Sequence, residues 1–193
     1  ACDYLAMAAD LLQPPPPCLI AGGGPSGSGK STLAMALAPS LGAVPGAVVI
    51  RSDEIRKKLC RSKPYDRLGP EGYTDEMAQR VYATTLEHAD SVIRGGYAAI
   101  VDAVFARPAD RDAVQHVAVA AGVPFVGLWL DAPERVLIAR VEGRGPDVSD
   151  ADAGVIRRQL AQQTDAIQWT CLDASGPRQL VLDEVYKVLP KGR

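Results

Sequence analysis

Asparagine is absent from this sequence of 193 residues, cysteine is scarce, and neither sign of charge dominates. The four cysteines (Cys2, Cys18, Cys60 and Cys171) lie far apart without a C-x-x-C pair, which argues against a zinc site and predicts reduced thiols in a cytoplasmic protein. The net charge of -2 excludes a general attraction to nucleic acid or anionic membranes, so any basic site must be local. No apolar run approaches the ~20 residues that a membrane span needs.

The remaining composition, 47% apolar and 23% charged, is typical of a single globular domain of this length. We expect residues 18–193 to form this domain. Residues 1–17 join a helical pattern, DYLAMAADLL, to the stretch QPPPP, which is typical of a stiff spacer. We therefore expect residues 1–17 to be a lead-in helix and a proline-rich linker that follow an N-terminal partner domain.

Five short apolar runs alternate with helical patterns in the expected domain. The runs cover residues 18–22, 47–50, 98–103, 125–130 and 168–173, and the helical patterns cover 30–41, 52–60, 74–96, 108–122, 132–143, 149–164 and 176–189. Near-continuous apolar runs are typical of parallel strands that are covered on both faces. The alternation therefore predicts an α/β fold with three layers, α/β/α, around a five-stranded parallel sheet. Because ligands of such sheets lie beyond the carboxyl ends of the strands, the polar residues that follow each run are the site candidates.

The stretch GGGPSGSGKST, residues 22–32, matches the phosphate-loop pattern G-x-x-x-x-G-K-[ST] after the first apolar run. Its glycines let consecutive backbone N–H groups point at phosphate oxygens, and the following helix presents its positive end to the same anion. We expect Lys30 to reach the β- and γ-phosphates, Ser31 to coordinate Mg²⁺ and Thr32 to contact the α-phosphate. The expected nucleotide-binding residues of the loop are Gly24, Ser26, Gly27, Ser28, Gly29, Lys30, Ser31 and Thr32. A glycine-rich turn with an incidental lysine is a poorer interpretation, since strand, loop and helix follow in the required order.

The absence of asparagine removes the Asn-Lys-x-Asp element that reads guanine, which favours ATP as the nucleotide. Hydrolytic motors usually carry a glutamate beside the acidic residue that ends the third strand, to activate water. Here Ala103 follows Asp102, so water is a less favoured acceptor of the phosphate. The sequence thus points toward transfer to another molecule.

Asp53 and Arg56 follow the second apolar run in the stretch RSDEIRKKL. A carboxylate at the end of that strand is placed to accept the proton of an incoming hydroxyl or to orient it for attack on the γ-phosphate. Arg56 lies three residues on, on the same helical face, where it can hold the acceptor. The alternative is that Asp53 only caps the helix, with Ser52 as a rival cap.

Arg140 and Arg144 lie one helical turn apart before a break rich in glycine, proline and aspartate. They can close over the triphosphate as a helical lid, exclude water and supply positive charge to the transition state. The alternative is a pair of solvated arginines on a surface helix.

Taken together, GGGPSGSGKST, RSDEIRKKL, IVDAVFARP, RVEGR and DASG resemble the P-loop kinases of the AAA-domain class. Relatives of this kind include polynucleotide 5′-kinase, gluconate kinase, chloramphenicol phosphotransferase and zeta toxins. The sequence is most similar to the C-terminal kinase module of bacterial proteins whose N-terminal half resembles an aminoglycoside phosphotransferase. The resemblance covers roughly residues 15 to 190.

The resemblance implies a role for each candidate. Asp53 matches the catalytic base and Arg56 the acceptor-binding arginine of a D-x-x-R element, while Arg140 and Arg144 match an R-x-x-x-R lid in which Arg140 is catalytic and Arg144 binds the nucleotide. Asp102 matches the acidic residue that helps to hold Mg²⁺ or positions the acceptor. The loop near the adenine corresponds to Ala174, Ser175 and Gly176, and Arg107 lies on the acceptor side.

We therefore expect an ATP- and Mg²⁺-dependent phosphotransferase that acts on a hydroxyl of a small molecule, such as a sugar or an antibiotic-like alcohol. One alternative is a polynucleotide 5′-hydroxyl kinase. It draws on the seven basic and three acidic residues of segment 51–67 and on Tyr65 and Tyr73, which can stack a base. The basic segment can equally be a solvated helix face. The other alternative is an ATP-binding regulatory module of a larger fusion protein.

Overall fold

The computed structural model describes residues 4–5, 8, 11–12, 14–145, 147–162 and 166–190. Its centre is a sheet in which all neighbouring strands are parallel and follow the order β2-β3-β1-β4-β5. The strands are β1 (Leu19–Gly23), β2 (Val48–Arg51), β3 (Ala99–Asp102), β4 (Phe125–Asp131) and β5 (Thr170–Asp173). The expected five-stranded parallel sheet is confirmed, and β1 lies at its centre.

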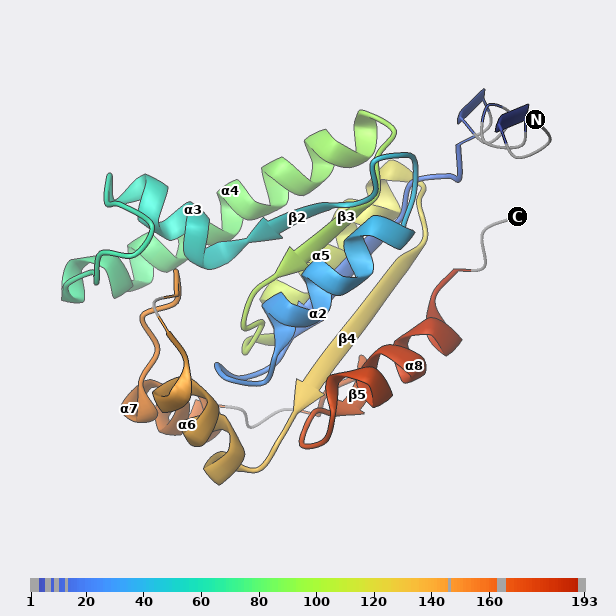
Figure 1. The fold of residues 1–193 in the computed structure, drawn as a ribbon. Helices are drawn as coiled ribbons and strands as arrows, with labels where there is room; N and C mark the ends of the chain where they lie inside the picture. Colours follow the sequence, from blue (N-terminus) through green and yellow to red (C-terminus); the bar gives the residue numbers. More distant parts are fainter. Residues whose placement is uncertain are drawn as a thin grey trace.

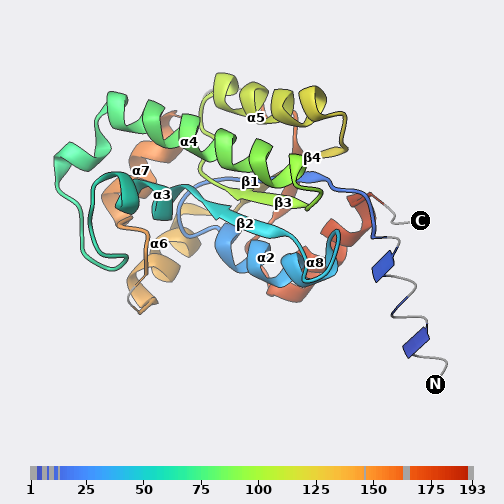
Figure 2. The same cartoon turned by 90° about the horizontal axis from the view of Figure 1, so that it is seen from above.

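Helices cover both faces of the sheet and complete the three layers (Figure 2). On one face lie α2 (Lys30–Leu37) and α8 (Arg178–Val188), and on the other lie α4 (Asp75–Arg94) and α5 (Pro108–Ala121). Helix α3 (Ser52–Leu59) follows β2 and adds Ile55 to the same core as α4 and α5. Short 3₁₀ turns, η1 (Ala38–Ser40) and η2 (Pro70–Tyr73), follow α2 and precede α4.

The two hydrophobic cores explain why the strands are apolar almost throughout. Along β1, the side chains of Leu19 and Ala21 belong to the core under α4 and α5, whereas Ile20 belongs to the core under α2 and α8. The alternation of a strand thus buries every residue when both faces are covered. Along β4, Trp129 and its neighbour Leu130 divide between the two cores in the same way.

A third, smaller core belongs to helices α6 (Glu134–Gly143) and α7 (Ala153–Gln162). We call α6, α7 and the described loop residues between them the lid. Figure 1 shows the two helices together beyond the carboxyl end of β4. Helix α7 begins at Ala153, not at residue 149 as expected, because the Asp152 carboxylate accepts a hydrogen bond of 2.9 Å from the Val155 N–H and so caps the first turn.

Half of the lead-in helix expected over residues 3–12 lies outside the described residues, and the division at residue 18 stays an expectation. Among the residues that the structure describes, no helix combines the length and the apolar character needed to cross a membrane.

Candidate active site

The phosphate loop lies between β1 and α2, at the carboxyl edge of the sheet, and its shape depends on glycine. Gly24, Gly27 and Gly29 have φ angles of 126°, 83° and 95°, which residues with a side chain rarely adopt. A Cβ atom on Gly24 would lie 2.2 Å from the Leu130 carbonyl oxygen, and one on Gly27 would lie 2.6 Å from the Leu137 carbonyl oxygen. The loop is therefore pressed between the end of β4 and the lid helix α6.

Several polar groups of the loop fit an anion. Gly29 is the N-cap of α2, and no side chain caps this helix end, so its N–H groups face the loop. The Ser28 hydroxyl is buried and has no hydrogen-bond partner among the described residues, which a phosphate oxygen would provide. Lys30 donates a 2.9 Å hydrogen bond across the loop to the Pro25 carbonyl. Burial lowers the pKa of Lys30, although the nearby carboxylates of Asp102 and Asp53 oppose this shift.

Ser31 and Asp102 form the pair expected to serve a metal. The Ser31 hydroxyl donates to Asp102 Oδ2 across 2.5 Å, and Asp102 ends β3 beside the loop. Burial raises the pKa of Asp102, while Lys30 and the Ser31 hydrogen bond oppose this shift. A hydroxyl and a carboxylate are hard oxygen donors that suit Mg²⁺. The described residues contain no group of three metal-ligating side chains, so a metal here would also need phosphate oxygens and water.

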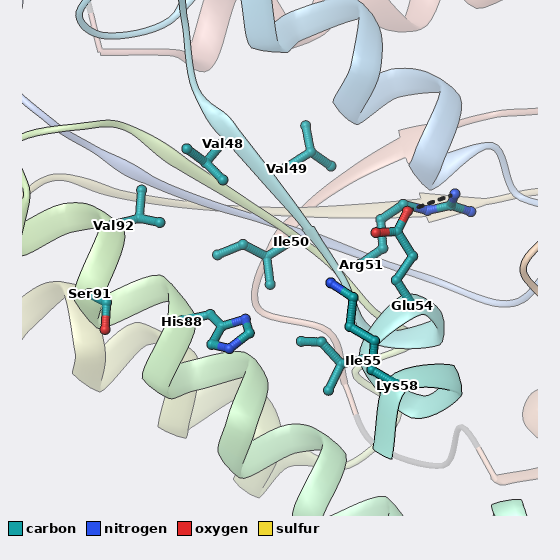
Figure 3. Close-up of a pocket in the computed structure, with 10 residues that line it drawn as sticks. All are labelled: Val48, Val49, Ile50, Arg51, Glu54, Ile55, Lys58, His88, Ser91 and Val92. Atoms are coloured by element: carbon teal, nitrogen blue, oxygen red, sulfur yellow. Dashed lines mark hydrogen bonds and ion pairs between the residues drawn. The ribbon is translucent and has the colours of Figure 1, made fainter. Parts of the chain in front are cut away.

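Arg51, the last residue of β2, reaches into this pair and was not among the sequence candidates. Its Nη2 lies 3.2 Å from the Ser31 hydroxyl and its Nε lies 3.4 Å from Asp102 Oδ2. Glu54, 3.4 Å away, contacts the same guanidinium at one end of a cavity of about 310 Å³ between β2, α3 and α4. Figure 3 shows this ion pair, with the apolar side chains of β2 along the rest of the cavity.

Asp53 and Arg56 lie on α3, which directly follows β2 at the carboxyl edge of the sheet. The N-cap position of α3 is Arg51 and no side chain caps the helix there, so Asp53 and Ser52 do not cap it. Burial lowers the pKa of Lys30 and raises the pKa of Asp102; the charge of Asp53 opposes the first shift and adds to the second. Asp53 therefore lies within electrostatic reach of the groups expected at the phosphates and the metal.

Arg56 packs against the segment that follows α3. Its Nη1 donates a 2.7 Å hydrogen bond to the Gly72 carbonyl, and its guanidinium lies 5.1 Å from the centre of the Tyr73 ring. Its Nε is buried without a partner among the described residues, so one donor is left for a ligand. Arg107 lies further along this edge, where it pairs with Asp110 at 2.9 Å.

The lid contacts the loop and the network around Arg51. Gln159 of α7 accepts a 2.8 Å hydrogen bond from the Ser26 N–H, so a lid side chain occupies one donor of the loop. Arg144 donates to Asp147 across 2.9 Å, and Asp147 also lies 3.3 Å from Arg51. Arg144 thus lies near the site, where its charge lowers the pKa of Lys30 after the larger effect of burial.

Arg140 points elsewhere. It lies 3.4 Å from the Ser175 carbonyl, in the loop expected near the adenine. Ala174 is buried and donates to the Asp131 carbonyl, whereas Ser175 and Gly176 are exposed. The structure therefore brings Arg140 to the expected adenine loop, whereas Arg144 contacts Asp147 and acts electrostatically on Lys30 of the phosphate loop. Thr32 is exposed at the start of α2.

A buried ion pair that the sequence did not reveal anchors the lid to α3. Lys57 Nζ donates to Asp150 across 2.6 and 2.7 Å, and the two side chains are only 3% and 9% exposed. Asp150 also accepts hydrogen bonds from the Leu68 N–H at 3.0 Å and the Tyr73 hydroxyl at 2.6 Å. Arg67 adds an ion pair with Asp152 at 3.0 Å.

Comparisons with known proteins show the family of this chain and its fold. A family model described as an AAA domain matches residues 19–168. An uncharacterised protein of Mycobacterium tuberculosis is 28% identical over an alignment of 193 positions, which covers 97% of this chain and 38% of that protein. This chain therefore spans well under half the length of that curated relative.

Two solved structures share the fold. A sugar kinase from Janibacter sp. HTCC2649 has a TM-score of 0.65 at 21% identity, over 89% of this chain and 94% of that chain. An APS kinase of Mycobacterium tuberculosis, in complex with AMPPNP and APS, also has a TM-score of 0.65, at 19% identity over 90% of this chain and 97% of that chain. With most of its length matched by the family model, the chain belongs to the AAA domain family, and its fold is that of the P-loop kinases, as the sequence motifs predicted.

Proposed function

We propose that this chain transfers the γ-phosphate of ATP to a hydroxyl group of a small molecule. The observation that carries the proposal is the position of Asp53. It is a carboxylate on α3, and its charge opposes the burial that lowers the pKa of Lys30 and adds to the burial that raises the pKa of Asp102. Its side chain caps no helix. A carboxylate so placed accepts the proton of an incoming hydroxyl or aligns its oxygen with the γ-phosphate.

The other candidates then take defined roles. The loop N–H groups hold the phosphate oxygens, and Lys30 turns from the Pro25 carbonyl to the β- and γ-phosphates. Arg144 supplies positive charge to the transferring phosphate from the lid, and Arg140 holds the loop beside the adenine. Arg56 binds the acceptor through the donor that it leaves free.

Ser31 and Asp102 would hold Mg²⁺, Ser31 through its hydroxyl and Asp102 directly or through water. Bound there, the metal would neutralise charge that develops on the phosphates. The chain itself orients the acceptor and receives its proton at Asp53.

The ion pairs made by the basic segment 51–67 favour a small molecule over a nucleic acid as the acceptor. Arg51, Lys57 and Arg67 pair with acidic residues inside the chain, and Arg56 contacts a carbonyl and an aromatic ring. Three of the seven positive charges of the segment are therefore paired within the chain, which leaves less free positive surface for phosphates. The solved structures of similar fold that are named as a sugar kinase and an APS kinase point the same way.

ADP release from Mg·ATP in the presence of an acceptor panel tests the proposal. The panel contains sugars, sugar acids, aminoglycosides, nucleosides and 5′-hydroxyl oligonucleotides. We expect Asp53→Ala to lower acceptor-dependent turnover by about 10²–10⁴-fold, the range of general acid–base catalysis, with ATP affinity nearly unchanged. Asp112→Ala, on the exposed side of α5, is the matched control and should keep full turnover.

A panel without any turnover, in a protein that binds ATP tightly, would contradict the proposal and favour a regulatory ATP-binding module. Turnover with the oligonucleotides alone would instead favour a polynucleotide 5′-kinase. Turnover that survives Asp53→Ala would remove Asp53 from the reaction.

A further inference from the structure

We infer that Arg51 occupies the cation position of the active site when no metal is bound, and that Mg²⁺ entering with ATP displaces its guanidinium toward Asp147. The inference rests on the proposed function, because it takes Ser31 and Asp102 as the residues that hold the metal. It makes Arg51 a positioning residue that links metal binding to the lid.

The first argument is that the guanidinium contacts both candidate ligands of the metal. Arg51 Nη2 lies 3.2 Å from the Ser31 hydroxyl and Nε lies 3.4 Å from Asp102 Oδ2. Arg51 comes from β2, while the two ligands come from α2 and β3, so three elements converge on one positive charge. In the absence of metal this charge neutralises the buried Asp102, whose isolated ionised form would be costly.

The second argument is that the two cations exclude each other. Mg²⁺ binds oxygen at about 2.0–2.1 Å in near-octahedral geometry, and a guanidinium within hydrogen-bond distance of the same hydroxyl would occupy part of that shell. Repulsion between a unit charge and a divalent ion a few ångströms apart is large at the dielectric constant of a protein. The guanidinium must therefore leave Ser31 before the metal can bind well.

The third argument is that two carboxylates beside Arg51 can hold its guanidinium after it leaves Ser31. Its Nε is buried but makes no hydrogen bond with the described residues, so its present position is incompletely satisfied. Asp147 and Glu54 lie 3.3 Å and 3.4 Å from its other nitrogens. A small rotation removes the guanidinium from Ser31 and keeps it beside two carboxylates.

Asp147 connects this displacement to the lid. It bridges Arg51 and Arg144, the latter at 2.9 Å. As Arg51 moves onto Asp147, its charge competes with that of Arg144 for the carboxylate. Arg144 then keeps only its hydrogen bonds to the Ser149 and Ala151 carbonyls and turns more readily toward the triphosphate. Arrival of the metal and the final placement of Arg144 thus become one coupled event.

Binding of a fluorescent ATP analogue, titrated with Mg²⁺ and without any acceptor, tests the inference. We expect Arg51→Met to lower the half-saturating Mg²⁺ concentration about tenfold, since it removes the competing unit charge. It should also weaken binding of the analogue in EDTA, because a cation beside the phosphates is lost. Arg94→Met, which removes an exposed arginine that pairs with Asp90 on α4, is the matched control and should leave both values unchanged.

Asp147→Asn should act in the opposite direction and raise the half-saturating Mg²⁺ concentration severalfold, because Arg51 then has one fewer acceptor outside the metal position. This effect should vanish in the Arg51→Met background if the two residues act as one unit, whereas independent charges would give additive effects. If Arg51→Met fails to fold, Arg51→Lys, which keeps the charge but not the fork that reaches both oxygens, should shift the Mg²⁺ requirement in the same direction.

An unchanged or higher Mg²⁺ requirement in the Arg51 variant overturns the inference, as do additive effects in the double variant. The Mg²⁺ titration needs no acceptor. An absence of turnover with every acceptor, together with the expected fall in the half-saturating Mg²⁺ concentration in the Arg51 variant, would therefore contradict the proposed function and leave this coupling intact. Acceptor-dependent turnover together with an unchanged Mg²⁺ requirement in the Arg51 variant would support the proposed function and overturn this coupling.

Discussion

The buried Lys57–Asp150 pair gives a prediction about stability, because one substitution isolates a charge. Lys57→Met keeps most of the aliphatic stem but leaves the Asp150 carboxylate, which is 9% exposed, without its cation. Removing one partner of a buried ion pair costs about 3–5 kcal/mol. Asp150 keeps its hydrogen bonds from the Leu68 N–H and the Tyr73 hydroxyl, so we expect the lower end, about 3 kcal/mol.

In thermal unfolding this loss is large enough to measure directly. A domain of this size loses about 2–4 °C in Tm for each kcal/mol, so Tm should fall by about 6–12 °C. Lys58→Met is the matched control, since Lys58 is the neighbouring lysine and is exposed. Its Tm should change by no more than about 2 °C, as surface substitutions rarely exceed about 0.5 kcal/mol.

The same pair predicts a pH dependence of stability. Burial alone would raise the pKa of Asp150, but the hydrogen bonds from Lys57, Tyr73 and Leu68 outweigh it and hold the pKa below its ordinary value. A carboxylate with a lowered pKa in the folded state stabilises the protein above its unfolded pKa of about 3.9, and this contribution is lost as the pH falls through the folded pKa. In Lys57→Met the folded pKa rises, so the loss on acidification should begin at higher pH. Equal Tm values for the two lysine variants would refute the assignment of a buried ion pair.

Two further predictions concern the phosphate loop. Gln159→Ala removes the side chain that accepts the hydrogen bond from the Ser26 N–H, so ATP should bind up to about tenfold more tightly in a fluorescence titration. Gln162→Ala, on the same helix, is the control. Equal ATP affinities of the two variants would mean that this hydrogen bond does not compete with the phosphate. Gly27→Ala places a Cβ 2.6 Å from a carbonyl of α6 at a φ of 83°, so urea unfolding should show a loss of about 1–3 kcal/mol and ATP binding should weaken. Gly143→Ala, where a Cβ meets nothing within 4 Å, should change neither, and a stable Gly27 variant would show that the loop adapts.

The sheet and the phosphate loop could be predicted from the sequence because their signals are local. An apolar run, a glycine-rich loop and a helix with a lysine at its start follow one another over residues 18–37, and each part is recognisable without its neighbours in space. The carboxyl-end rule then led to Asp102 and Asp53, because it depends only on where strands end.

The network behind the loop could not be predicted, because its partners come from distant parts of the chain. Lys57 lies in a run of basic residues that gives no sign of burial, and its partner Asp150 is 93 positions away in a break that the sequence marks only as a lid loop. The sequence likewise shows Arg51 only as one of the basic residues of segment 51–67, with no sign of its contact with Ser31 and Asp102. The two interpretations of the segment, a solvated face or a nucleic-acid surface, both left out internal pairing with lid carboxylates.

The strand order also separates the two halves of the proposed reaction in space. β1 is central, so the phosphate loop is flanked on one side by β3 and β2, which carry Asp102, Arg51 and the start of α3, and on the other by β4 and β5, which lead to the lid and the expected adenine loop. Under the proposed function, the acceptor side of the site is built by the elements on the β2 side of the sheet, and the expected adenine loop lies on the β5 side. The proposed function therefore makes the segment from α3 to α4 the place to exchange when the acceptor is to be changed by design, provided that the Lys57–Asp150 pair with the lid is kept.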